Sequence, residues 1–247
     1  MKRSIVVLLL GSLFLSFAGC NDPEQAKRIA DLEERVAALE KKPAPAGAPG
    51  APAAPAANAE EEQAAATLLK EVSQLMEKPD YDGAKAKLAE LKEKYSSTRA
   101  AKAAMRLEEE LSVIGRDEAP LQVEKWYQGS EKDVHKGKAT LYVFWEVWCP
   151  HCRREVPKLT ETYNKYNGQG LDIVGLTKQT RDIKDEDVVK FIEENKVVYP
   201  IAKEQGDAMS TAYGVRGIPA AAVVKGGKVV WRGHPAKLTD AMIQGWL

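Results

Sequence analysis

Apolar residues recur every three or four positions between Glu60 and Gly115, which predicts three amphipathic helices. Pro79 is expected to end the first helix, because proline cannot continue it. Ser96 or Ser97 is expected to cap the third helix. Residues 59–116 are therefore predicted to form a small all-α module.

From about Asp117 the helical spacing gives way to short apolar runs that alternate with amphipathic stretches. A late pair of runs flanks Gly226-Gly227, as in a β-hairpin. This alternation predicts an α/β fold for residues 117–247, with a mixed sheet and helices on both faces. The predicted strands are 140–145, 171–176, 220–225 and 228–232, and the predicted helices are 153–167, 185–195, 209–213 and 236–247.

The second and third helices of the module loosely resemble a tetratricopeptide-type hairpin, a unit that often binds partners. Leucine and alanine at helical spacing are also what an ordinary helical core requires. A packing or spacing role and a partner-binding role both remain open for residues 59–116.

The N-terminus reads as a targeting segment, residues 1–19. Lys2 and Arg3 precede a short apolar run that ends in Ala18-Gly19-Cys20. This ending resembles the lipobox of bacterial lipoproteins, which implies a signal peptide and lipidation of Cys20 as a membrane anchor. Phe17 departs from the usual leucine, and an ordinary secretory signal is the alternative. The protein is expected on the periplasmic side of a bacterial membrane, inner or outer.

Residues 20–42 are predicted to form a lipid-anchored stalk, because their apolar residues have coiled-coil spacing. Part of it resembles a pattern of short trimeric coiled coils, so a homotrimer and a monomeric amphipathic helix are both open. Residues 43–58, almost wholly Ala, Pro and Gly, are predicted to be a semi-extended linker. The apolar stalk positions are Ile29, Leu32, Val36 and Leu39.

The charge balance and the cysteine count argue against a nucleic-acid-binding protein and against a disulfide-framed scaffold. The chain has 36 basic and 36 acidic residues, so it offers no basic field for nucleic acid. Its three cysteines are too few for a disulfide-framed scaffold. If Cys20 carries lipid, the remaining thiols are Cys149 and Cys152, in a compartment where disulfides persist.

Cys149-Pro150-His151-Cys152 directly follows a predicted buried strand and precedes a helix. A structural disulfide over so short a loop would stabilise the fold weakly. A metal site would need more ligands than the three histidines offer in their unrelated contexts, so neither metal nor cofactor is predicted. A redox-active disulfide is the favoured interpretation, since a cysteine at a helix N-terminus gains from the helix dipole.

Residues 119–247 resemble the thioredoxin-fold thiol–disulfide oxidoreductases of the TlpA/ResA kind. The resemblance rests on the motif at 148–152, on Glu155-x-Pro157 and on the stretch from Tyr213 to Pro219. It implies a thioredoxin-like fold, Cys149 as the attacking thiol and Cys152 as the resolving one. It also implies a cis-proline loop, and a substrate-binding surface that comprises Trp148, Pro150, His151, Ile218 and Pro219.

Glu155 matches the acid that ResA-like proteins carry after the second cysteine, which implies a proton-handling role; a surface glutamate is the alternative. Many thioredoxins place a buried acid where this chain has Val143. Glu146 stands where a small apolar residue is usual, and the sequence gives no account of it.

The direction of electron flow is open from the sequence. Pro150-His151 is the dipeptide of the oxidising DsbA type, whereas Ile218, Glu155 and the tethered architecture favour a reductase. A DsbA-like oxidase and an isomerase or chaperone are the alternatives, and a trimeric stalk would favour the isomerase. The expected partners are disulfide-containing exported proteins and a membrane thiol–disulfide electron partner.

Overall fold

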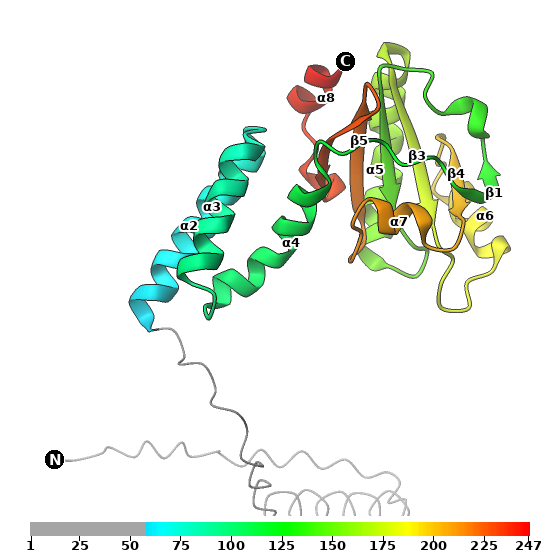
Figure 1. The fold of residues 1–247 in the computed structure, drawn as a ribbon. Coiled ribbons are helices and arrows are strands. Elements are labelled where there is room, and N and C mark those ends of the chain that lie inside the picture. Colours follow the sequence, from blue (N-terminus) through cyan, green and yellow to red (C-terminus); the bar gives the residue numbers. More distant parts are fainter. Residues whose placement is uncertain (1–57) are drawn as a thin grey trace, which may run out of the picture. The chain divides into compact units, whose positions relative to one another are not determined.

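A six-stranded mixed sheet organises the fold in the computed structural model, which describes residues 58–247 (Figure 1). The central strand β2 pairs in parallel with β3 and antiparallel with β5. The predicted mixed sheet and thioredoxin-like fold are confirmed. The order is β1-β4-β3-β2-β5-β6, with β1 at Val123–Gln128, β2 at Ala139–Phe144, β3 at Leu171–Thr177, β4 at Ile201–Glu204, β5 at Ala220–Lys225 and β6 at Lys228–Gly233.

The predicted signal peptide, Cys20, the stalk and nearly all of the linker lie outside the described residues. Within residues 58–247, no helix is both long enough and apolar enough to cross a membrane.

Helices cover both faces of the sheet because side chains alternate along each strand. On β2, Leu141 and Val143 face one core, and Tyr142 and Phe144 face the other. The first core is closed by α5 (Pro150–Tyr166), α6 (Asp185–Glu194) and α8 (Asp240–Trp246). The second core is closed by the short α7 (Ala208–Ala212) and by Val113, at the end of the helical module.

The helical module has three helices with a core of their own: α2 (Ala59–Glu77), α3 (Tyr81–Lys94) and α4 (Arg99–Val113). The predicted caps of the third helix were wrong. Thr98 Oγ1 accepts the Ala101 amide at 3.1 Å, because the two serines lie in the preceding turn. The chain then passes to the sheet, where the Gly115 amide donates to the Val229 carbonyl at 2.8 Å.

Three elements differ from the sequence prediction, and one of them is the four-residue strand β4, which the predicted strands did not include. The edge strand β1 was missed because its residues are mostly half-exposed and show no clean alternation. The predicted helix 236–247 is instead a 3-10 turn at Pro235–Lys237 followed by α8. Thr239 separates the two, because its side chain caps α8 by accepting the Met242 amide at 3.2 Å.

The hairpin predicted at Gly226-Gly227 is present. Both glycines have positive φ, 57° and 71°, which a two-residue turn between twisted strands requires.

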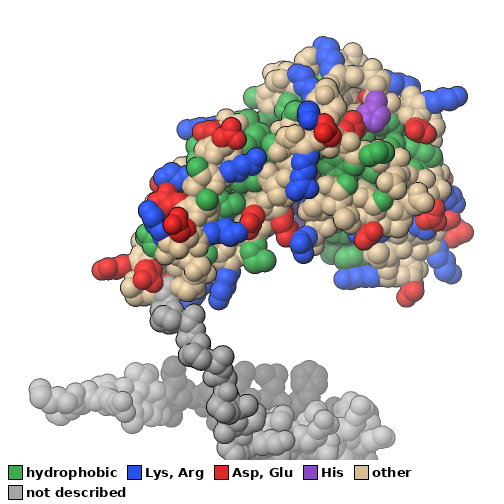
Figure 2. Space-filling view, viewed as in Figure 1, with side chains coloured by type: hydrophobic (Ala, Val, Ile, Leu, Met, Phe, Trp, Pro, Cys, Tyr) green, Lys and Arg blue, Asp and Glu red, His purple; other side chains and the backbone are tan. Residues whose placement is uncertain are grey.

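Basic and acidic side chains are interspersed on the face shown in Figure 2, as expected from their equal numbers.

Candidate active site

Cys149 occupies the N-cap of α5, at the end of a turn that leaves the central strand. The turn closes where the Cys149 amide donates to the Glu146 carbonyl at 3.1 Å. Pro150 takes the first helical position, where its missing N–H costs nothing. The Cys152 amide donates to Cys149 Sγ at 3.4 Å. The helix N-terminus therefore stabilises negative charge on Cys149, as a nucleophilic thiol requires.

Cys152 lies one helical turn further in and is fully buried. Burial, with a smaller contribution from Cys149, raises the pKa of the Cys152 thiol far above its usual range. Cys152 therefore stays protonated at neutral pH and becomes a nucleophile only when a base takes its proton. This difference fits Cys149 as the attacking thiol and Cys152 as the resolving one.

The Ile218–Pro219 peptide bond is cis, and its loop lies against the active-site turn. Cys149 Sγ donates to the Ile218 carbonyl at 3.8 Å, a long contact for a weak donor. Pro219 is buried and Ile218 half-buried. The loop thus places the Ile218 backbone beside the Cys149 sulfur.

Trp148 forms a wall beside Cys149 and is held from two sides. Its indole Nε1 donates to Thr180 Oγ1 at 3.0 Å, and the Arg181 guanidinium lies 3.5 Å from its ring centroid. Trp148 and Ile218 both line a groove of about 240 Å³. The groove residues come from β2 and the turn after it, from the loop after β3 and from the cis-proline loop: Phe144, Trp145, Glu146, Trp148, Leu176, Lys178, Thr180, Ser210, Val215, Arg216, Gly217 and Ile218.

His151 is exposed on the first turn of α5 and contacts Arg154. Arg154 Nη2 lies 2.7 Å from His151 Nδ1. A guanidinium can only donate, so His151 Nδ1 is the acceptor in this contact.

Glu155 lies at the side of α5 and accepts a hydrogen bond from Lys158 Nζ at 3.0 Å. Its side chain is 14 % exposed, and among the described residues it contacts the Lys158 ammonium rather than the Cys152 thiol. Its proton-handling role stays a prediction.

Glu146, which the sequence left unexplained, is buried behind the active-site turn. Its carboxylate accepts hydrogen bonds from Thr177 Oγ1 at 3.1 Å and from the amides of Lys178 at 3.1 Å and Thr180 at 3.3 Å. Burial raises the pKa of Glu146, and these hydrogen bonds partly oppose the rise. A charged residue directly after an apolar strand was the available sequence signal.

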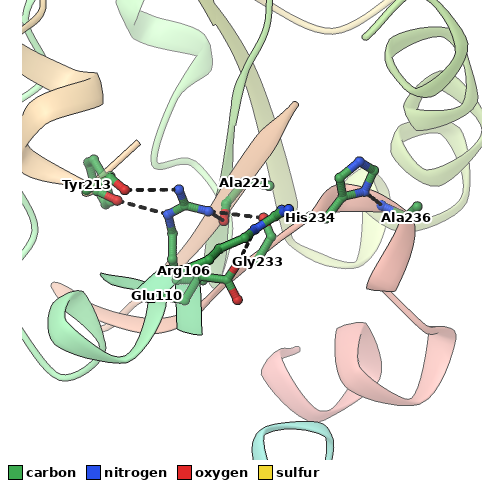
Figure 3. A network of polar contacts seen from close by, with 9 residues as sticks. Arg106, Glu110, Tyr213, Ala221, Gly233, His234 and Ala236 are labelled. Carbon is green, nitrogen blue, oxygen red and sulfur yellow. Dashed lines mark hydrogen bonds and ion pairs between the residues drawn. The ribbon is translucent and has the colours of Figure 1, made fainter. Parts of the chain in front are cut away.

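Arg232 is a second site residue that sequence reasoning missed. It is 5 % exposed and lies on β6 behind the cis-proline loop. Its guanidinium donates to the carbonyls of Tyr213 at 2.9 Å, Gly233 at 3.2 Å, and Gly214 and Ala221 at 3.4 Å (Figure 3). Arg232 therefore ties together the chain on both sides of Ile218-Pro219.

Within residues 58–247, no three His, Cys, Asp or Glu side chains converge as a metal site would require. Cys149 and Cys152 are both free thiols.

The raised pKa of Cys152 predicts a pH-dependent second step of exchange. Below its pKa, the thiolate fraction of Cys152 rises with pH. Release of a client from its mixed disulfide with Cys149 should therefore accelerate about tenfold per pH unit at neutral pH. If Glu155 accepts the Cys152 proton, Glu155→Gln should slow this step about tenfold or more, and Lys158→Ala should not. Stopped-flow measurement of client release checks both, and a rate independent of pH would contradict the burial argument.

Residues 118–232 match the AhpC/TSA family, which fits the thioredoxin-like fold and the paired thiols. The chain is 33 % identical over 125 residues to the thiol-disulfide oxidoreductase ResA of Bacillus thuringiensis subsp. konkukian, covering 49 % of this chain and 70 % of the relative. It is 25 % identical over 112 residues to ResA of Halalkalibacterium halodurans, covering 45 % of this chain and 62 % of the relative.

Among solved structures, the thioredoxin domain of a thiol-disulfide oxidoreductase from Bacteroides vulgatus is 29 % identical, with a TM-score of 0.46. The match covers 54 % of this chain and 98 % of that one. The fold and the paired thiols define a thioredoxin-fold thiol–disulfide oxidoreductase. Within that class, the chain belongs to the ResA family.

Proposed function

We propose that this enzyme is a membrane-tethered reductase that exchanges disulfides with exported proteins through Cys149 and Cys152. The Cys149 thiolate attacks one sulfur of a client disulfide, forms a mixed disulfide and expels a client thiolate. Cys152 then loses its proton and attacks Cys149 Sγ. This step closes the Cys149–Cys152 disulfide and expels the second client thiolate. The client gains two electrons and two protons, and a membrane thiol–disulfide partner must return the enzyme to its dithiol form.

The contact between Arg154 and His151 supports the choice of a reductase. A protonated histidine in the active-site turn would stabilise the Cys149 thiolate, and with it the reduced form, which makes an enzyme oxidising. Arg154 Nη2 donates to His151 Nδ1, so in this contact the ring accepts a hydrogen bond and does not present this nitrogen as a donor. The high pKa of the buried Cys152 acts in the same sense, because it leaves the reduced form without a second stabilised thiolate.

The second candidate is a DsbA-like oxidase, which Pro150-His151 favours. The two functions differ in an assay of direction with the full chain. As a reductase, the dithiol form should reduce insulin, and its disulfide form should leave a reduced, unfolded protein largely unoxidised over the same period. Rapid oxidation of the unfolded protein, with slow reduction of insulin, would favour the oxidase.

The tether rests on the sequence of residues 1–42, which lie outside the described structure. Lipid on Cys20 would anchor the enzyme on the periplasmic side, and the stalk and linker would give it reach. Cys20→Ala should move the protein from the membrane fraction to the soluble fraction. Retention in the membrane would contradict the lipid anchor. An isomerase role would require a trimeric stalk and stays a prediction.

A further inference from the structure

The loop between β3 and α6 forms the wall of the groove next to Trp148. Gln179, Arg181 and Asp182 in this loop have φ between 58° and 60°, a left-handed conformation that non-glycine residues adopt only when their surroundings hold them. A segment with this backbone needs an anchor.

Glu146 supplies the anchor. Its two carboxylate oxygens accept two hydrogen bonds from the loop and one from Thr177 at the end of β3, and the side chain is only 4 % exposed. The Thr177 hydroxyl accepts the Gln179 amide at 3.1 Å, which links the anchor to the first left-handed residue. A fully bonded carboxylate in this buried place fixes the loop relative to the active-site turn.

The anchored loop carries positive charge to the groove. Lys178 is one of the residues that line it, and the Arg181 guanidinium lies over the ring of the lining residue Trp148. Among residues 58–247, neither Lys178 nor Arg181 has an ion-pair partner. By contrast, the groove residue Arg216 is paired with Glu109. Glu146, the carboxylate that lines the groove, is occupied by the loop, and the exposed Asp182 lies outside the lining.

We propose that this wall recognises acidic side chains next to the disulfide of a client polypeptide, with Lys178 and Arg181 as the recognising cations and Glu146 as a positioning residue. The inference rests on the proposed exchange with clients and names their chemistry. Cations beside a groove raise the local concentration of an acidic segment and its association rate. Cys149 directly follows the groove residue Trp148 in the active-site turn. An acidic residue near the client cystine can therefore contact Lys178 or Arg181 while Cys149 reacts with the client sulfur.

The test uses two cystine peptides that are identical except for the residues beside the cysteines, which are Asp and Glu in one and Lys in the other. The measured quantity is the second-order rate constant with the reduced full-length enzyme. The acidic peptide should react about tenfold faster at low salt, and this preference should shrink to about twofold at high salt. Lys178→Glu/Arg181→Glu should remove or reverse the preference, whereas Lys184→Glu, an exposed cation outside the groove lining, should preserve it.

Glu146 is tested by the same ratio of rate constants. Glu146→Ala should reduce the preference to about twofold, because the loop loses its anchor. Glu146→Gln, which keeps one acceptor oxygen, should restore part of the preference. A change in folding alone would slow both peptides without changing their ratio.

Equal rates for the two peptides, or a preference that survives Lys178→Glu/Arg181→Glu, would overturn the inference. Unchanged selectivity in Glu146→Ala would overturn the positioning role. The uncharged hydroxyethyl disulfide distinguishes a failure of the proposed client recognition from a failure of the proposed disulfide exchange. If it reacts while neither peptide does, the client inference fails and the exchange activity stands. If none of the three reacts, the proposed function fails as well.

Discussion

Cys149→Ser should lower the rate of disulfide exchange by about a thousandfold or more, because the hydroxyl cannot replace the thiolate as nucleophile. Cys152→Ser should leave the first step intact and block the second. Cys149 sits at the N-cap of α5, whereas Cys152 is fully buried behind it. The Cys152→Ser enzyme should therefore accumulate a mixed disulfide between Cys149 and the client.

The adduct is measured by intact mass and on a non-reducing gel after incubation with an oxidised peptide. The double variant Cys149→Ser/Cys152→Ser is the control and should form no adduct at either position. If the adduct instead accumulated in Cys149→Ser, Cys152 would be the attacking thiol, and the assignment drawn from burial and the helix N-terminus would be reversed.

Arg232→Ala should lower the free energy of unfolding by about 3 kcal/mol or more. The substitution removes a buried guanidinium that bonds three backbone carbonyls around the cis-proline loop and the carbonyl of its neighbour Gly233. Burial lowers the pKa of Arg232, and the nearby Glu110 opposes this change. Denaturant unfolding measures the loss, and the rate of exchange with a peptide should also fall, because the loop beside Cys149 loses its support.

Two variants serve as controls for this prediction. Arg232→Lys keeps the charge without the planar fork and should recover only part of the stability. Arg216→Ala removes a cation near the same loop whose side chain is 79 % exposed, and it should cost less than about 1 kcal/mol. A loss in Arg232→Ala no larger than that in Arg216→Ala would show that the buried hydrogen bonds contribute little.

The sequence predicted the features of this enzyme that depend on neighbouring residues. The paired cysteines after a buried strand, the position of Cys149 at a helix N-terminus and the Gly226-Gly227 hairpin are all local patterns. The strand β1 was not predicted, because the half-exposed residues of this edge strand do not alternate between apolar and polar. The N-caps Thr98 of α4 and Thr239 of α8 were not predicted. Several neighbouring residues could cap each helix, and only the folded structure shows which of them does.

The supporting residues of the site could not be predicted because their partners are distant in the chain. Glu146 bonds residues more than thirty positions away, and Arg232 bonds backbone carbonyls, which leave no mark in the sequence. Their roles follow from the meeting of β2 with β3 and of β5 with β6 in the sheet. For Glu155 the resemblance to ResA-like proteins gave a role, proton transfer with Cys152, and that role stays a prediction.

The reduction potential of the Cys149–Cys152 pair tests the central claim most directly. It is measured by equilibrating the full chain against defined ratios of reduced and oxidised dithiothreitol or glutathione. A reductase should have a potential of about −250 mV or lower, in the range of thioredoxin. A value of about −120 mV, in the range of DsbA, would show that Pro150-His151 dominates, and it would contradict the proposed direction of electron flow.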